Sequence, residues 1–311
     1  MTIGTTPNGL HTPITNVVRT ESSLDNSKIS AGQIGELGEL AIGEDLGIET
    51  IPRTILESSI VDFRIPDLEG LADIGAATFG LSIRETRFGT DERIQVEDTS
   101  KFPWCAIASL LITAADNTSW IGTAWFTSPR TLITAGHCVY IKNEETVERN
   151  GWVKKIQVMP GRSGIKLPYG SITATEFWTV KGWGESGLET CDYGAIILPV
   201  PFEKDLGSFG FRVYNDEELL NKPANVPGYP SDKTSGTLWY DNRAMGKVEP
   251  EKVYYQADTA GGQSGCPVYV IKDKVRWAVG IHAYGGQQSN SGTRIHDAVF
   301  DNLKAWKEAG V

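Results

Sequence analysis

From about residue 93 onward, the apolar positions fall into short runs rather than long periodic stretches. Between the runs stand Gly, Pro, Asn and Asp, residue types that favour turns. Short apolar runs separated by turn residues predict an all-β sandwich or barrel. The expected strands cover residues 106–113, 121–127, 131–134, 152–158, 173–180, 193–198, 224–226, 253–256, 268–271 and 277–282.

A helical period appears only at the C-terminal end of the chain. Val299, Leu303 and Trp306 fall at i, i+4 and i+7, on one face of a helix. Asp297 opens this segment and Gly310 follows it, which suits the two ends of a helix. We expect a helix over residues 296–309 that packs on the rest of the protein through its apolar stripe.

The first 85 residues differ in composition from the rest of the chain. They hold 5 Lys/Arg and 13 Asp/Glu, against 24 and 26 in residues 86–311, and none of the Trp, Tyr or Cys. Residues 1–35 show no lasting period and are expected to be disordered or extended. Such an acidic leader suits a poorly structured propeptide better than a second folded domain, with a disordered tail as the alternative. We therefore place the folded domain at residues 86–311.

The composition of the whole chain limits its partners. With 40% apolar and 22% charged residues, the 311 residues can build an ordinary folded core. The net charge of −10 argues against nonspecific binding to nucleic acid. No run of about 18 uncharged apolar residues is present, so no membrane-spanning helix is expected. The first thirty residues also lack the apolar core of a secretory signal.

Residues 258–267, Asp-Thr-Ala-Gly-Gly-Gln-Ser-Gly-Cys-Pro, place a serine among three glycines. Glycine lets the backbone take a positive φ and lets another molecule approach its N–H groups. Ser264 on such a turn can be a nucleophile, and the amides of Gly262 and Ser264 can form an oxyanion hole. Gly/Ser clusters are commonly plain turns, so this interpretation needs a base and a carboxylate elsewhere.

Two further blocks supply those groups. A serine nucleophile needs a histidine base whose second ring nitrogen is held by a carboxylate. His137 stands in Thr-Ala-Gly-His-Cys (134–138), directly after an apolar run. Asp192 opens the apolar run Asp-Tyr-Gly-Ala-Ile-Ile-Leu (192–198), where a partly buried carboxylate needs a partner.

These blocks, in the order His, Asp, Ser, resemble the chymotrypsin-fold serine peptidases, and more narrowly their glutamyl endopeptidase (V8-like) branch. The resemblance runs from about residue 86 to about 303 and includes Gly-Thr-Arg-Ile (292–295). It implies two antiparallel six-stranded β-barrels, over about 93–200 and 201–294, followed by the C-terminal helix.

The resemblance also implies the catalytic roles. His137 would be the general base, Asp192 would orient it, and Ser264 would be the nucleophile of a serine endopeptidase that works through an acyl-enzyme. Gly262 and Ser264 would donate to the oxyanion. The alternative from another class is a catalytically silent homologue that binds peptides.

The substrate pocket implied by the family rests on two segments. In glutamyl endopeptidases a histidine at the place of His282 and a threonine at the place of Thr259 bind the substrate carboxylate, and both side chains can donate hydrogen bonds to an acid. Tyr284 lies in the same segment as His282, Gly-Ile-His-Ala-Tyr-Gly (280–285). Asp258 conflicts with this assignment, because trypsin-like enzymes place there the aspartate that selects Arg or Lys. We rank cleavage after Glu or Asp first and trypsin-like cleavage through Asp258 second.

Activation can also be inferred from the resemblance. In the trypsin branch an aspartate precedes the nucleophile and pairs with a newly freed N-terminus. Gln263 cannot form that ion pair, which supports the V8-like placement. Cleavage after Glu85 would be self-processing by a Glu-specific enzyme.

The cysteines contain no Cys-x-x-Cys pair, so no zinc or redox motif has local support. An even number suits two disulfides and an oxidising compartment, although three connectivities exist and buried thiols are the alternative. If His137 bonds Asp192, their chain neighbours lie close together, which favours the pairs Cys138–Cys191 and Cys105–Cys266. The usual family bridge cannot form, because the segment Trp-Ile-Gly-Thr (120–123) lacks a cysteine. A metal site at His137 and Cys138 ranks below a disulfide.

The chemistry implied here requires no metal and no organic cofactor. The expected partners are protein or peptide substrates, with no nucleic acid and no membrane. The family and the cysteine usage imply a secreted enzyme, which we expect to be a monomer.

Overall fold

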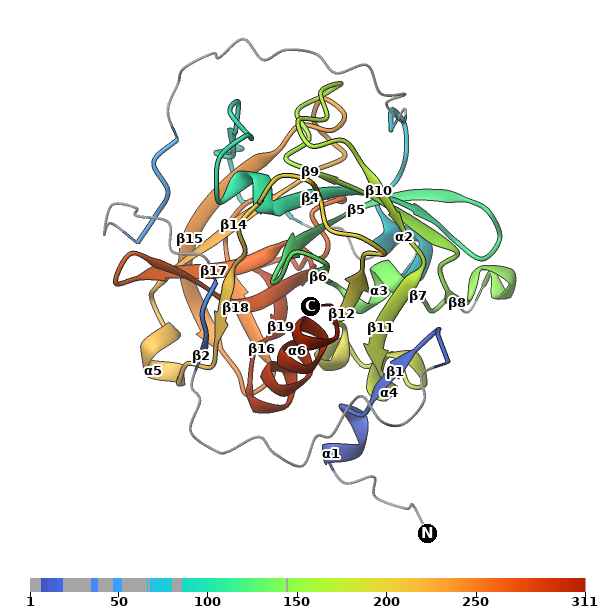
Figure 1. Ribbon diagram of the computed structural model, residues 1–311. Coiled ribbons are helices and arrows are strands. Elements are labelled where there is room, and N and C mark those ends of the chain that lie inside the picture. The colour runs from blue at the N-terminus through green and yellow to red at the C-terminus, as the bar shows by residue number, and fades with distance from the viewer. Residues whose placement is uncertain are drawn as a thin grey trace.

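The computed structural model describes residues 7–18, 35–38, 47–51, 66, 68–79, 86–143 and 145–310. Strands dominate, and they form two large sheets with short helices at their edges (Figure 1). The predicted all-β fold is therefore confirmed. Within the described part of the chain, no helix is both long and apolar enough to cross a membrane.

The first sheet has eight antiparallel strands. Its longest pairing joins residues 107–113 to residues 119–126 through a tight turn. In this turn the Asp116 carboxylate accepts the Thr118 N–H at 3.0 Å, and Asn117 has a φ of 69°. Across the sheet the strands are β1 (Pro13–Thr15), β11 (Glu176–Val180), β12 (Gly194–Ile197), β6 (Thr131–Thr134), β5 (Ser119–Phe126), β4 (Ile107–Thr113), β9 (Lys155–Pro160) and β10 (Ile172–Ala174).

The second sheet closes into a barrel. Its ring runs through β17 (Pro267–Lys272), β14 (Pro223–Gly228), β15 (Trp239–Val248), β16 (Lys252–Tyr255), β19 (Asn290–Arg294) and β18 (Val275–Tyr284), and β18 pairs back to β17. A two-residue turn joins β17 to β18, with positive φ at both Asp273 and Lys274, as the twist of a hairpin favours. One unit is thus a six-stranded barrel, as expected, whereas the other is a wider sheet.

The C-terminal helix α6 spans Asp297–Ala309 and confirms the predicted helix. Val299, Leu303 and Trp306 are fully buried, and the backbone oxygen of Trp306 accepts a hydrogen bond from Thr131 Oγ1 at 3.1 Å. This helix packs on β6 and β12 of the first sheet.

The remaining helices and minor strands are short. They are α3 (Gly136–Val139), α4 (Lys181–Gly184), α5 (Asp216–Leu219), the 3₁₀ turns η4 (Trp104–Ala106), η5 (Val147–Arg149) and η6 (Glu189–Cys191), and the strands β3 (Ile94–Gln95), β7 (Tyr140–Ile141), β8 (Gly151–Trp152) and β13 (Gly210–Arg212). Of these strands, β3 and β13 extend the second sheet, and β7 pairs with β8.

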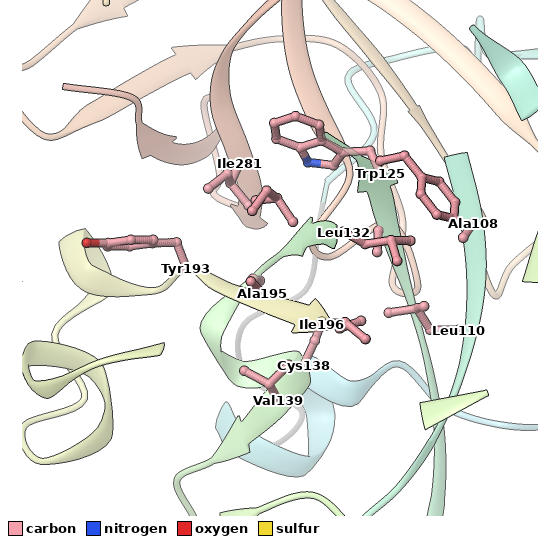
Figure 2. Packing of buried hydrophobic residues seen from close by; sticks show 14 of the residues in the cluster. Ala108, Leu110, Trp125, Leu132, Cys138, Val139, Tyr193, Ala195, Ile196 and Ile281 are labelled. Atoms are coloured by element: carbon pink, nitrogen blue, oxygen red, sulfur yellow. The ribbon is translucent and has the colours of Figure 1, made fainter. Parts of the chain in front are cut away.

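Large apolar side chains form one core that packs on the first sheet and extends between this sheet and the barrel. Figure 2 shows Leu110 of β4, Leu132 of β6 and Ile196 of β12 packed together, with Trp125 above them. All four are completely buried. Burial of each such side chain stabilises the fold by about 1.5–3 kcal/mol, so this packing holds the ends of β6 and β12 in place.

The described parts of the leader lie on the folded domain. The leader contributes α1 (Pro7–Leu10), β1 at the edge of the first sheet, β2 (Gly35–Glu36) beside β13, and α2 (Ile74–Phe79), which lies against α3 (Figure 1). We expected disordered or extended chain in residues 1–35. Residues 13–15 are extended, and they are ordered by pairing with β11. That partner is about 160 residues away in the sequence, so local composition does not reveal the pairing. Glu85 lies outside the described residues.

The cysteines form no disulfide. All four lie in the described part of the chain as buried thiols, so the expected Cys138–Cys191 and Cys105–Cys266 bridges are corrected. The sulfur of Cys138 faces the backbone oxygen of Ser264 at 3.7 Å, whereas the sulfur of Cys191 packs against Gly182. Neighbours of a bonded pair can direct their side chains apart, and they do so here.

Candidate active site

His137 and Asp192 meet because of the pairing between β6 and β12. Gly194 lies opposite Thr134, so the residues just outside the paired segment come together. The backbone N–H of His137 donates to Asp192 Oδ1 at 2.8 Å, and its ring Nδ1 lies 2.7 Å from Asp192 Oδ2. His137 thus contacts both carboxylate oxygens of Asp192, and these two contacts fix the direction of its imidazole ring.

The pair is fully buried. Burial by itself lowers the pKa of His137, but the charge and hydrogen bond of the Asp192 carboxylate raise this pKa well above its ordinary value, with a contribution from Cys138. An imidazole held in this way can accept a proton and keep it in a buried site.

Tyr284, which we expected among the substrate-binding residues, contacts Asp192 of this pair. Its hydroxyl donates to Asp192 Oδ2 at 2.6 Å. Burial, and then the nearby Asp192 charge, raise the pKa of Tyr284 well above its usual range, so the phenol stays a hydrogen-bond donor. The alternation of residues along β18 predicts on which face of the strand Tyr284 lies, but it does not predict that Asp192 is the hydrogen-bond partner of Tyr284.

Ser264 lies on a turn that only glycines allow. Gly262 has a φ of 100° and Gly265 a φ of 88°. A Cβ on Gly265 would stand 2.1 Å from Thr134 Oγ1 and 2.3 Å from the backbone oxygen of Thr123. The turn is therefore pressed against the end of β6, immediately before the helix that carries His137.

Backbone hydrogen bonds hold the same turn to both units. Thr123 N–H of β5 donates to Ser264 O at 2.9 Å, and Gly265 N–H donates to His282 O of β18 at 2.7 Å. The three predicted catalytic residues are thus brought together where the sheet meets the barrel.

The peptide between Gly261 and Gly262 has a defined orientation. Ser231 N–H donates to Gly261 O at 2.6 Å. In a trans peptide the C=O and the following N–H point in opposite directions, so the N–H of Gly262 faces away from Ser231. The carbonyl of Gly262 accepts from Thr123 Oγ1 at 2.7 Å.

Thr259 and His282 are both fully buried. Among the residues that the structure describes, the hydroxyl of Thr259 has no hydrogen-bond partner, although an unpaired buried hydroxyl costs about 1–3 kcal/mol. His282 Nδ1 lies 2.6 Å from the hydroxyl of Tyr255, and its backbone pairs with the nucleophile turn. Thr259 thus offers an unused donor, and His282 has one ring nitrogen fixed.

Asp258 holds a backbone segment. Its two carboxylate oxygens accept the N–H groups of Phe88 at 2.6 Å and of Glu92 at 3.0 Å, and it is 2% exposed. Asp258 is therefore an anchor for the start of the folded domain rather than the base of a basic pocket. Its place six residues before the serine does not reveal this, because the residues that it binds come from the opposite end of the domain.

Arg93 is a residue of the site that the sequence pattern does not indicate. Its guanidinium donates to Gln263 Oε1 at 3.3 Å and to Asp232 Oδ2 at 2.6 Å. Burial lowers the pKa of Arg93, but Asp91 and Asp232 raise it by more, so the side chain stays charged. A cation of the same chain therefore supports the residue before the nucleophile.

Asp73 of the leader is the second such residue. Ser264 Oγ donates to Asp73 Oδ2 at 3.4 Å, and Ile121 N–H donates to Ala72 O at 3.1 Å. The spacing of Leu71, Ile74 and Ala77 is the one signal of a docked helix in this stretch, and Ile74 and Ala77 are fully buried. Short leader segments are otherwise hard to place, because their partners lie elsewhere in the chain.

Comparison with known proteins bears on the same region. No protein-family model matches the chain. A glutamyl endopeptidase of Bacillus licheniformis is 37% identical over 231 residues, which are 71% of this chain and 69% of that protein. The chain belongs to the glutamyl endopeptidase family.

Two further likenesses accompany this family membership. A Bacillus subtilis (strain 168) protein that is named extracellular metalloprotease is 40% identical over 220 residues, which are 70% of this chain and 68% of that protein. The solved structure of a Glu endopeptidase in complex with MPD has a TM-score of 0.63 and 25% identity, and covers 72% of this chain and 100% of that one.

Proposed function

We propose that the protein is the precursor of a secreted serine endopeptidase that cleaves after glutamate. The observation that carries the proposal is the double contact of His137 with Asp192 beside the Ser264 turn. Secretion is supported by the extracellular relative, and the enzyme would act on proteins or peptides as a monomer.

In the proposed mechanism Ser264 Oγ attacks the carbonyl carbon of the scissile bond and passes its proton to His137 Nε2. The N–H groups of Gly262 and Ser264 bind the oxyanion. His137 then protonates the leaving amine, and an acyl-enzyme remains on Ser264. Water, with His137 again as base, hydrolyses the ester and restores the serine. Asp192 holds the ring and stabilises the imidazolium throughout.

The proposed pocket takes a carboxylate. Thr259 supplies a buried hydroxyl without a partner, and the Tyr255 contact fixes the ring of His282 so that Nε2 would be its donor to the substrate. Both donors suit an acidic side chain. Because both oxygens of Asp258 are used by backbone amides, it is not a counter-ion for Arg or Lys, and its repulsion of a glutamate substrate is reduced.

The leader would act as a propeptide, with residues 86–311 as the peptidase domain. The contact of Asp73 with Ser264 and the pairing of Ala72 with Ile121 support this proposal, because they put leader backbone where a substrate would approach the serine. Ser264 is only 1% exposed with the leader in place. Removal of the leader, with Glu85 as the expected cleavage point, would open the cleft.

The test is a set of matched peptides that carry Glu, Asp, Arg, Lys or Phe before the scissile bond, incubated with the processed enzyme. We expect the highest kcat/KM with Glu, and covalent labelling of Ser264 by a fluorophosphonate. Preference for Arg would reject the pocket assignment. Failure to label the processed protein would favour the silent peptide-binding homologue.

A further inference from the structure

Three side chains from distant parts of the sequence converge beneath the C-terminal helix. They are His11, which directly follows α1 of the leader, Glu251 of the turn between β15 and β16, and His296, which directly precedes α6. One ligand atom from each can be chosen so that all three lie within 4.8 Å of one another. None of these residues belongs to the catalytic group described above.

The geometry of the three groups is close to that of a metal site. The imidazole rings of His11 and His296 have centroids 5.0 Å apart and an interplanar angle of 82°, and His11 Nε2 lies 3.8 Å from Glu251 Oε1. Zinc binds histidine nitrogens and carboxylate oxygens at about 2.0–2.2 Å, so tetrahedral ligand atoms lie about 3.4 Å apart. Side-chain movements of about 1.5 Å or less would close the site, and the Glu251 side chain, 45% exposed, has room to make them.

His296 has an unpaired nitrogen at this place. Its Nε2 is buried and has no hydrogen-bond partner within the described part of the chain. Buried polar atoms are normally paired, because an unpaired one costs about 1–3 kcal/mol. A ligand that accepts the lone pair of Nε2 would remove this cost.

The ring of His11 is held by the kind of contact that supports metal-binding histidines. It is 9% exposed, and its Nδ1 lies 2.9 Å from the hydroxyl of Tyr193. Asn302 donates both to that hydroxyl and to the backbone oxygen of His11, each at 2.8 Å. Figure 2 shows the Tyr193 hydroxyl directed away from the packed Ala195 and Ile196 side chains. With Nδ1 engaged in this way, Nε2 is the nitrogen that faces Glu251 and can bind a metal.

The charges around the cluster permit a cation. The charge of Arg294 acts on His296, but its guanidinium is paired with Asp216 Oδ1 at 2.6 Å and with the backbone oxygens of Tyr214 and Glu249. Neutral imidazole is the form of histidine that binds metals.

We propose that His11, Glu251 and His296 form a zinc site that fastens leader residues 7–18 to the folded domain. Two imidazoles and one carboxylate are a known type of three-ligand zinc set, with the exposed side of Glu251 leaving a fourth position for water. The site is complete only while the leader is docked, so zinc strengthens the attachment of β1 to β11, and a chelator weakens it.

The test uses the full-length chain with Ser264→Ala, which removes self-cleavage and makes the result independent of the proposed peptidase activity. Zn²⁺ is added to the chelator-treated protein in a calorimeter. We expect one Zn²⁺ per chain, with an affinity that falls at least tenfold in His296→Ala and in Glu251→Gln. The matched control is Glu203→Gln at an exposed position, which leaves the affinity unchanged.

A second measurement follows the melting temperature of the same proteins. One equivalent of Zn²⁺ raises the melting temperature of the Ser264→Ala chain and has little effect on the version that also carries Glu251→Gln. Because Glu251→Gln conserves size at a partly exposed side chain, misfolding does not mimic this result. The site is rejected if Zn²⁺ does not bind stoichiometrically. It is also rejected if the His296→Ala and Glu251→Gln variants bind Zn²⁺ as tightly as the parent Ser264→Ala chain.

Discussion

Asp192 accepts hydrogen bonds from the backbone and the ring of His137 and from the hydroxyl of Tyr284. Together these donors fix the position of the Asp192 carboxylate against the histidine. The effect of each donor can be measured separately, because Tyr284 can lose its hydroxyl without a change of shape.

We expect Tyr284→Phe to lower kcat/KM of the processed enzyme by about tenfold, the equivalent of a hydrogen bond to a charged group. The acid limb of the pH profile should move to higher pH, because the less solvated Asp192 charge raises the pKa of His137. Tyr254→Phe is the matched control, since the Tyr254 hydroxyl bonds Glu249 outside the site. A profile equal to that of the parent enzyme would show that Tyr284 has only a packing role.

Thr259 offers a different test at the residue scale. Its buried hydroxyl has no partner among the described residues, so Thr259→Val should leave the melting temperature of the Ser264→Ala chain equal or higher. In the active enzyme the same change should reduce kcat/KM for a Glu peptide by about tenfold, with little effect on a Phe peptide. Equal losses on both peptides would mean that Thr259 does not contact the substrate side chain.

At the scale of elements, the strands and the terminal helix follow from local pattern, whereas the leader does not. Runs such as 107–113 carry their own strand signal, and Val299, Leu303 and Trp306 carry their own helical one. The strand β1 has three half-buried residues, and its only strong feature is its pairing with β11. Such a segment becomes predictable only when its partner strand is known.

The helix α2 lets us test the leader as an inhibitory element. Ile74 is fully buried against the domain, so Ile74→Ala should weaken docking by about 2–5 kcal/mol. We expect faster labelling of Ser264 by a fluorophosphonate in the unprocessed chain, measured on the full-length band of a gel. Ile165→Ala, at a side chain that is 74% exposed, is the control. An unchanged labelling rate would argue against occlusion by α2.

At the scale of the whole molecule, the sheet and the barrel meet at a buried ion pair. Because the pKa of His137 is raised in the folded protein, the pair stabilises the fold fully below the unfolded pKa of about 6.5. That contribution is lost as the pH rises through the raised value. The groups that face the ring are Asp192 and Cys138.

In the Ser264→Ala background we therefore expect His137→Gln to lower the melting temperature most near about pH 6, with a difference that shrinks towards about pH 9. Thermal melting of the two proteins across this range measures the difference directly. A difference that grows with pH would mean that His137 is neutral in the folded protein.

The proposed catalytic trio could be inferred from the sequence because each member stands in a short block with its own local signal. These signals are a glycine turn around Ser264 and apolar runs beside His137 and Asp192. The roles of Asp258 and Tyr284, the thiol state of Cys138 and Cys191, and the contact of Asp73 with Ser264 could not be inferred in this way. Their partners lie in other elements, and a side chain that is one position away in the sequence can point the opposite way in space.

Alternation, turn residues and helical spacing are properties of neighbouring residues, so the sequence alone determined the all-β character and the C-terminal helix, and it indicated the proposed reacting groups. Only the tertiary structure decided which donors reach Asp192, which backbone Asp258 holds, and how the leader joins His11 to Glu251 and His296. These contacts depend on the packing of segments up to about 290 residues apart, and no local pattern encodes the direction in which two such segments meet.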